Sequence, residues 1–310
     1  MNGPFLRAPV LWLTERDTFR RFATRSWVGR RVAGRFVAGE TLEQAMDATR
    51  LLDRSSIASM LDYLGENVTS PGQASAAADR YVLALKRLRE ADEIDANISV
   101  KLTQLGLDVS YELCMENAER VLTAAAESGT LVMIDMEASE YVDPTLRAHR
   151  ELRERFPKVG VCLQSALYRT PADVVELPEG STIRLVKGAY LEAPTVAHPS
   201  RRGVDLGFAR LFATLVARGH TVHVATHDPG MIDGARAFVH RHGTPWDRVE
   251  FQMLYGIRRD LQQQLARDGY PVRVYIPYGS EWYPYLTRRL AERPANLWFF
   301  AQNLVKGGAR

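Results

Sequence analysis

The chain has 310 residues, 46% hydrophobic and 25% charged, a composition typical of a globular protein with a sizeable core. Its 40 basic and 37 acidic residues leave a net charge of only +3, which gives no electrostatic case for nucleic-acid binding. The only cysteines, Cys114 and Cys162, are too few for a disulfide framework and lack metal-site spacing, so we expect a reduced, cytoplasmic protein without structural metal.

The first 50 residues are predicted to form a helical extension packed on the main domain. The segment AGETLEQAMDATRLLDR (38–54) has apolar residues at helical spacing and a candidate N-cap in Thr41. Arginines also concentrate here, at Arg16, Arg20, Arg21, Arg25, Arg30, Arg31 and Arg35. Such a cluster forms either a solvated helix face or a contact with an anionic membrane surface, and both interpretations stay open. No stretch reaches the roughly 20 apolar residues that a membrane span needs.

Eight strand candidates, separated by stretches of helical periodicity such as 111–128, follow along the chain. They lie at 56–61, 98–102, 130–136, 159–164, 182–187, 221–226, 249–254 and 272–277. Strict strand and helix alternation predicts a parallel sheet, and eight is the number of strands that closes such a sheet into a barrel. The sequence therefore predicts a (βα)₈ barrel of the TIM type over residues 51–305, with an open doubly wound sheet as second choice and 306–310 as a flexible tail.

Polar side chains gather where the strands are expected to end, which is where α/β barrels carry out their chemistry. They are Glu66, Lys101, Asp135, Glu137, Gln164, Arg184, Lys187, Thr226, His227, Asp228, Gln252, Tyr275 and Tyr278. Lys101, Asp135 and Arg184 lie inside otherwise apolar runs, so at least some of them must point into the barrel. Because a buried unpaired charge is costly, these groups must pair with one another or bind a ligand.

A second group of polar residues lies on the helix expected after the eighth strand. Tyr285, Arg288, Arg289 and Glu292 fall at i, i+3, i+4 and i+7 and so share one face. Adjacent arginines can clamp a carboxylate through paired hydrogen bonds, with the tyrosine covering an apolar ring beside it. A solvated, self-paired helix face is the alternative.

Other chemistries leave weaker signals. No histidine stands at zinc spacing from His227, which disfavours a metal site. Lys101 or Lys187 on a barrel strand would suit a Schiff-base aldolase. No Gly-x-Gly-x-x-Gly or P-loop motif occurs, so a bound nucleotide must be held in another way.

Several motifs in a fixed order carry a family resemblance. They are RLVKGAY (184–190) and YLTRRLAE (285–292), supported by LGE (64–66), SVKL (99–102), Asp135, CLQ (162–164) and ATHD (225–228). With these the chain resembles the proline dehydrogenase family in its monofunctional bacterial form. The resemblance implies a distorted (βα)₈ barrel whose last helix lies over the carboxyl ends of the strands.

The resemblance also implies a cofactor and a reaction. FAD would be bound non-covalently by Met136, Gln164, Arg184, Lys187, Gly188, Ala189, Thr226 and His227. L-proline would be oxidised to Δ1-pyrroline-5-carboxylate, the first step of its catabolism to glutamate, by hydride transfer from C5 to flavin N5. Arg184 would stabilise negative charge on the reduced flavin, and Asp135 would orient Lys101. Another flavin barrel enzyme, such as a methylenetetrahydrofolate reductase, remains an alternative.

The same resemblance assigns the substrate pocket and the electron acceptor. Arg288 and Arg289, assisted by Lys101, would hold the proline carboxylate. The ring would be enclosed by Leu185, Tyr190, Tyr275 and Tyr285. Glu66 would pair with Arg289 or Arg288 and close the site as a gate, to which we also assign Glu292. Electrons would pass to a membrane quinone, for which peripheral membrane contact is expected, and a separate pyrroline-5-carboxylate dehydrogenase would take the product.

Overall fold

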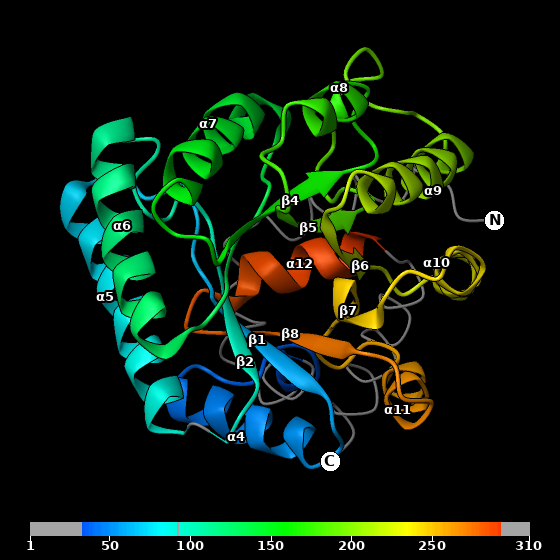
Figure 1. The fold of residues 1–310 in the computed structure, drawn as a ribbon. Helices are drawn as coiled ribbons and strands as arrows, with labels where there is room; N and C mark the ends of the chain where they lie inside the picture. Colours follow the sequence, from blue (N-terminus) through cyan, green and yellow to red (C-terminus); the bar gives the residue numbers. More distant parts are fainter. Residues whose placement is uncertain (1–32, 92, 293–310) are drawn as a thin grey trace, which may run out of the picture.

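Eight parallel strands form a closed barrel in sequence order, surrounded by helices (Figure 1). The computed structural model describes residues 33–91 and 93–292, with 288–292 described by backbone alone. The strands are β1 (Ala58–Tyr63), β2 (Ala96–Val100), β3 (Val132–Ile134), β4 (Val159–Gln164), β5 (Thr182–Val186), β6 (Thr221–Ala225), β7 (Val249–Leu254) and β8 (Val272–Tyr278). The predicted barrel is confirmed, with β4 and β7 ending where expected and β1 lying two residues later.

Helices between the strands cover the outside of the barrel. They are α5 (Pro71–Glu90), α6 (Tyr111–Ser128), α7 (Val142–Arg153), α8 (Thr170–Val175), α9 (Arg201–Ala217), α10 (Pro229–His242) and α11 (Arg259–Arg267), with 3₁₀ turns η2 (Ser139–Tyr141) and η3 (Trp246–Arg248). Ser70, Ser110, Ser200 and Asp228 cap α5, α6, α9 and α10 by accepting a backbone N–H. These caps satisfy donors that the first helical turn leaves unpaired, so each helix begins at a defined residue.

Helix α4 (Leu42–Asp53) completes the barrel wall. Thr41 caps it through a capping box with Gln44, which confirms the predicted start of this helix. The helix packs against β1 and β8, the place that a helix following β8 would otherwise take. It runs across residue 50, and the division of the chain at residues 50 and 305 stays a prediction.

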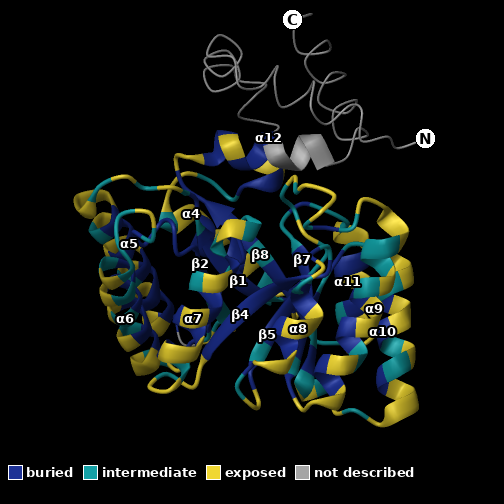
Figure 2. Cartoon of the chain, turned by 90° about the horizontal axis from the view of Figure 1, so that it is seen from above, coloured by how far each residue is buried: buried dark blue, intermediate teal, exposed yellow. Residues whose placement is uncertain are grey.

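Helix α12 (Trp282–Glu292) lies across the barrel end instead of along its wall, as Figures 1 and 2 show from two directions. Its buried side chains Trp282, Tyr283, Tyr285 and Leu286 form a cluster with Leu64 after β1, with Ile257 after β7, and with Ala33, Phe36 and Val37. Leu64 and Ile257 follow the carboxyl ends of their strands, so α12 covers the carboxyl-terminal mouth. The predicted position of the last helix is confirmed.

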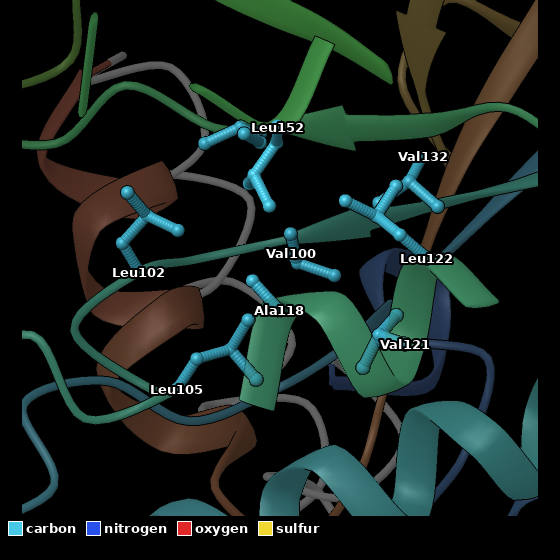
Figure 3. Close-up of a pocket in the computed structure, with 9 residues that line it drawn as sticks. Val100, Leu102, Leu105, Ala118, Val121, Leu122, Val132 and Leu152 are labelled. Atoms are coloured by element: carbon cyan, nitrogen blue, oxygen red, sulfur yellow. The ribbon is translucent and has the colours of Figure 1, made fainter. Parts of the chain in front are cut away.

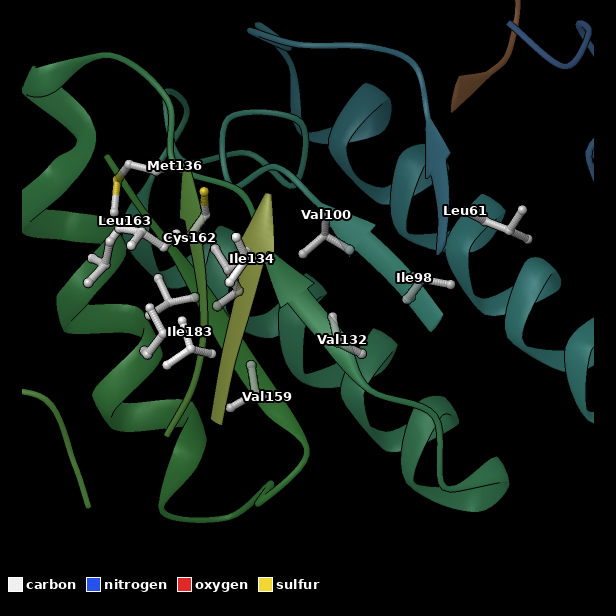
Figure 4. Packing of buried hydrophobic residues seen from close by; sticks show 14 of the residues in the cluster. Leu61, Ile98, Val100, Val132, Ile134, Met136, Val159, Cys162, Leu163 and Ile183 are labelled. Atoms are coloured by element: carbon white, nitrogen blue, oxygen red, sulfur yellow. The ribbon is translucent and has the colours of Figure 1, made fainter. Parts of the chain in front are cut away.

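Apolar side chains fill the space between the strands and the helices. The core includes Leu61, Ile98, Val132, Ile134 and Ile183, packed as Figure 4 shows. A small cavity between β2, β3 and α6 measures about 10 Å³ and has only apolar lining residues (Figure 3). Because a cavity of this size and polarity does not hold a water, it is a packing gap and not a ligand site.

The arginines from Arg16 to Arg31, for which a membrane contact was left open, lie outside the described residues. The predicted flexible tail 306–310 lies outside them too. Within the described part of the chain, no helix combines the length and hydrophobicity of a membrane span. Cys114 and Cys162 are buried and not joined in a disulfide.

Candidate active site

Three charged side chains from three strands meet inside the barrel near its carboxyl end. Asp135 follows β3 and accepts a hydrogen bond from Nη1 of Arg184 on β5. Its second oxygen lies 3.4 Å from Nζ of Lys101, which follows β2. Arg184 and Lys101 expose less than a tenth of their side chains. These charges therefore meet one another in the interior, which is one of the two outcomes that the sequence left open.

Asp62 on β1 and Tyr275 on β8 complete this group. Nζ of Lys101 donates to Oδ1 of Asp62 at 2.8 Å, and the hydroxyl of Tyr275 donates to Oδ2 of Asp135 at 2.7 Å. Ser99 on β2 donates to the other oxygen of Asp135 at 2.6 Å. Asp62 is fully buried and was not among the predicted site residues. Two acids thus face two cations across the mouth of the barrel.

The charges in this group control one another's protonation. Burial alone would raise the pKa of Asp135, but Arg184 and Lys101 outweigh burial and hold that pKa below its ordinary value. Burial also favours neutral Lys101, yet Asp62, Tyr275 and Asp135 raise its pKa well above the ordinary range. Asp62 differs, because burial raises its pKa despite the attraction of Lys101. At neutral pH, Lys101 is an ammonium ion and Asp135 a carboxylate.

The Arg184 guanidinium is held at all three nitrogens. Nε donates to Oε1 of Gln252 on β7 at 2.8 Å, and Nη1 also donates to Ser99 at 3.1 Å. Nη2 contacts Sδ of Met60 on β1. The guanidinium carbon lies 5.2 Å from the centre of the Tyr275 ring, within cation–π range. The side chain is therefore locked between β1, β2, β7 and β8.

The residues predicted to bind a cofactor lie at the adjacent carboxyl ends of β3 to β6. Gly188 after β5 has a φ of +118° and is exposed, and a Cβ there would lie 3.0 Å from Oε1 of Gln164 and 3.1 Å from Cβ of Ala166. Only glycine fits this close approach without strain. Nε2 of Gln164 donates to the Glu137 carbonyl at 2.8 Å. Met136 is buried near Cys162 and Leu163 (Figure 4), and Ala189 is partly buried.

Lys187 belongs to a charged cluster at the start of α10. Its Nζ lies 2.7 Å from Asp205 and 3.0 Å from Asp228, and Arg201 donates to Asp228 at 2.9 Å. Asp228 caps α10, and these bonds hold its pKa below the ordinary value although burial opposes them. Two cations next to a helix amino terminus can hold a phosphate if the acids release them.

Thr226 and His227 lie in the turn between β6 and α10. The hydroxyl of Thr226 accepts from the Asp228 amide at 3.2 Å, and Nε2 of His227 accepts from the Leu254 amide at 2.9 Å. Since Nε2 accepts, the proton of the neutral ring is on Nδ1. In the described part of the chain, no group of three or more His, Cys, Asp or Glu residues is arranged to hold a metal ion.

The predicted substrate residues are only partly brought together. Tyr275 joins the charged group, and Tyr285 is buried in the cluster under α12. Tyr190 is partly buried in the loop after β5. Leu185 is fully buried in the core, on the face of β5 opposite to Arg184, so the structure does not bring it to this group. The side chains of Arg288, Arg289 and Glu292 lie outside the described residues, although their backbone belongs to α12.

Two further carboxylates lie at the mouth. Glu137 after β3 accepts from the amide and hydroxyl of Thr103 at 3.2 and 2.6 Å. Burial, with a smaller contribution from the charge of Glu66, raises the pKa of Glu137 to about 7. Glu66 is therefore near enough to act electrostatically on the site.

A larger cavity of about 270 Å³ lies elsewhere, at the amino ends of β1 and β8, beside Asp95 and Tyr270.

A closed parallel barrel that gathers charged side chains at the carboxyl ends of its strands has the architecture of a TIM-barrel enzyme. A family model described as proline dehydrogenase matches residues 45–302. Proline dehydrogenase of Deinococcus radiodurans is 43% identical over 314 residues, which cover 99% of this chain and 100% of that protein. Proline dehydrogenase 1 of Bacillus subtilis subsp. natto is 39% identical over 302 residues, 97% of this chain and 99% of that protein. The chain belongs to the proline dehydrogenase family, as the motifs predicted.

A solved structure shares the fold. Proline utilization A from Bdellovibrio bacteriovorus, inactivated by N-propargylglycine, matches with a TM-score of 0.80 and 21% identity. The match covers 91% of this chain and 38% of that one. At this identity the likeness supports the barrel fold alone.

Proposed function

We propose that this chain oxidises L-proline to Δ1-pyrroline-5-carboxylate with non-covalently bound FAD. The observation that carries the proposal is the locked arrangement of Arg184, Asp135, Lys101 and Tyr275 at the barrel mouth, in a chain of the proline dehydrogenase family. To bind a zwitterionic amino acid that has an apolar ring, a site needs groups of both charges around that ring. This site offers cations, a carboxylate and an aromatic ring together.

The residues around the mouth fit FAD. Gly188 opens the backbone at the end of β5, because any side chain there would be strained and crowded against Gln164. Lys187 and Arg201 supply cations at the start of α10, where diphosphate oxygens would displace Asp205 and Asp228. Gln164, Thr226 and His227 supply hydrogen-bonding groups, with Met136 and Ala189 as apolar contacts. FAD bound there would accept the hydride that leaves C5 of proline.

The chain's own residues would bind and orient the substrate. Arg184 holds a fixed positive charge where negative charge develops during the reaction, so no reorganisation is needed at that moment. Asp135 orients Arg184 and Tyr275, and together with Asp62 it keeps Lys101 charged. Lys101 would assist Arg288 and Arg289 in holding the proline carboxylate by charged hydrogen bonds. Tyr190, Tyr275 and Tyr285 would enclose the ring.

Closure of the site is part of the proposal. Glu66 follows β1 at the edge covered by α12 and acts on the pKa of Glu137, so it is close to the mouth. An ion pair of Glu66 with Arg289 or Arg288 would tie β1 to α12 over bound substrate, and Glu292 would belong to the same gate. The kinetics of Glu66→Ala test this closure, and an unchanged KM and kcat would remove the gate from the proposal.

Electrons would leave the enzyme for a membrane quinone. We assign the arginine-rich start of the chain to peripheral contact with the inner face of the cytoplasmic membrane, where anionic lipids attract basic segments. The protein would otherwise be cytoplasmic, and a separate pyrroline-5-carboxylate dehydrogenase would take the product. Binding to vesicles with and without anionic lipid tests the membrane contact.

An anaerobic spectrum tests the main proposal. The purified protein should show flavin absorbance that L-proline bleaches, with the pyrroline product trapped by an aminobenzaldehyde. A flavoprotein bleached by a reduced folate and not by proline would indicate a methylenetetrahydrofolate reductase-like enzyme. A colourless protein that borohydride links covalently to a carbonyl substrate would indicate the lysine aldolase. Either result would refute the proposal.

A further inference from the structure

A second polar layer lies below the candidate site, on the inner faces of β5 to β8, which are neighbours in the barrel (Figure 1). Gln252 is its central residue, 5% exposed, with its Oε1 2.8 Å from Nε of Arg184. Its Nε2 lies 2.7 Å from Oε1 of Glu250 and 2.8 Å from Nδ1 of His223. Gln252, Glu250 and His223 have no part in the proposed chemistry.

The orientation of the Gln252 amide is determined by its partners. A guanidinium can only donate and a carboxylate can only accept, so the amide oxygen must face Arg184 and the amide nitrogen must face Glu250. His223 then accepts at Nδ1, which requires a neutral ring with its proton on Nε2. Burial supports this state, since it lowers the pKa of His223 to about 4. In the reverse orientation, the amide nitrogen would face Nε of Arg184, which is also a donor, and the amide oxygen would face Oε1 of Glu250, which is also an acceptor.

Glu250 is itself anchored at the amino end of the barrel. Nε of Arg273 on β8 donates to both of its oxygens, at 2.9 and 3.0 Å. Nη1 of Arg273 donates to Asp95 at 2.9 Å and to the Ser59 carbonyl at 2.9 Å. A continuous hydrogen-bonded chain therefore runs from the amino end of the barrel through Glu250 and Gln252 to Arg184.

Gln252 differs from Asp135 in what it does to Arg184. Asp135 holds the guanidinium and also compensates its charge, whereas a neutral amide holds it and leaves its charge intact. The Nε bond also fixes the plane of the guanidinium, because Nε is the nitrogen next to the side-chain stem. We infer that Gln252 is a positioning residue, oriented by Glu250 and His223, that fixes the Arg184 charge beside bound FAD. This inference rests on the proposed function.

The test is the midpoint potential of bound FAD, measured by dithionite titration in Gln252→Leu. Loss of the Nε acceptor loosens Arg184, so we expect a more negative potential and a fall of about tenfold in kcat for proline, with less change in KM. The same substitution in an Arg184→Lys background should leave the potential of that background unchanged, because Gln252 acts through Arg184. Asn117→Leu on α6 is the matched control, since Asn117 is also a buried amide but bonds Leu105 and Arg120. It should lower the Tm and leave the potential unchanged.

Two results would overturn the inference. One is an unchanged potential and kcat in folded Gln252→Leu, and the other is an equal shift in both Arg184 backgrounds. If Gln252→Leu fails to fold, Glu250→Gln provides the same comparison, because a glutamine at position 250 can donate as well as accept and no longer imposes the orientation of the Gln252 amide. Dithionite titration needs no proline, so a wild-type protein that binds FAD but does not oxidise proline would refute the proposed function and leave this comparison intact.

Discussion

Replacement of Asp135 by Asn tests whether the charged group at the barrel mouth works as a unit. The carboxylate accepts hydrogen bonds from Ser99 at 2.6 Å and Tyr275 at 2.7 Å, and it pairs with Arg184. Asn keeps the size of the side chain but removes the charge and turns one acceptor into a donor. Two buried cations would then face Asp62 alone.

The expected magnitude follows from burial. Removing one partner of a buried ion pair costs about 3–5 kcal/mol, and the remaining Asp62 places this case near the lower end, at about 3 kcal/mol. For a chain of 310 residues, whose entropy of unfolding is about 0.65 kcal/mol/K, we expect a fall in Tm of roughly 4–6 °C. Loss of charged hydrogen bonds that position Arg184 should also lower kcat/KM for proline by about 10- to 100-fold.

Thermal unfolding by circular dichroism and proline-dependent dye reduction measure the two effects. Asp233→Asn is the control, because it removes an exposed ion pair with Arg236 and should change stability by less than about 0.5 kcal/mol. The pKa of Asp135 is lowered in the folded state, so its contribution is present at neutral pH and is lost as pH falls through that lowered pKa. A variant with wild-type Tm at pH 7 would refute the role of Asp135 as the shared counterion.

Three further predictions concern a carboxyl group, a glycine and a helix cap. The pKa of Glu137 is raised to about 7, so its contribution to stability is complete below its unfolded pKa and is lost as pH rises toward 7. In chemical unfolding at a series of pH values, Glu137→Gln should show a smaller decline in stability over this range than the wild type. An equal decline in both proteins would contradict this prediction. Gly188→Ala should cost about 1–3 kcal/mol and weaken FAD retention on a desalting column, whereas Gly234→Ala, in open space within α10, should be neutral or stabilising. Thr41→Ala should cost about 1 kcal/mol in urea unfolding, and an unchanged midpoint would show that the cap does not stabilise α4.

The sequence predicted the barrel because every strand is a short apolar or β-branched run between helical patterns. It also predicted that at least some of Lys101, Asp135 and Arg184 point into the barrel and either pair with one another or bind a ligand, since a buried unpaired charge is costly. The position of α4 could not be predicted in the same way. Which helix covers the wall between β8 and β1 depends on how the barrel closes. The hydrophobic pattern of α4 is compatible with packing against any apolar surface and does not identify this one.

The misses in the site have local causes. The first strand was placed two residues early, so Asp62 fell beyond its expected end and was not counted among inward-facing residues. Strand periodicity places Leu185 on the face of β5 opposite to Arg184, and its assignment to the substrate pocket stays a prediction. Ser99 lies in the SVKL motif, but a serine in a strand does not by itself indicate a role until its partner Asp135 is located.

The division of labour between the two faces of the strands explains how the barrel tolerates a charged interior. Outward-facing side chains such as Val100, Ile134 and Ile183 supply apolar burial against the helices, which is the main source of stability. Inward-facing Arg184, Lys101 and Asp135 contribute little net stability, since desolvation offsets most of their attraction. Substitutions that keep the inner charges balanced should therefore change the chemistry more than the fold, whereas substitutions that unbalance them should change both.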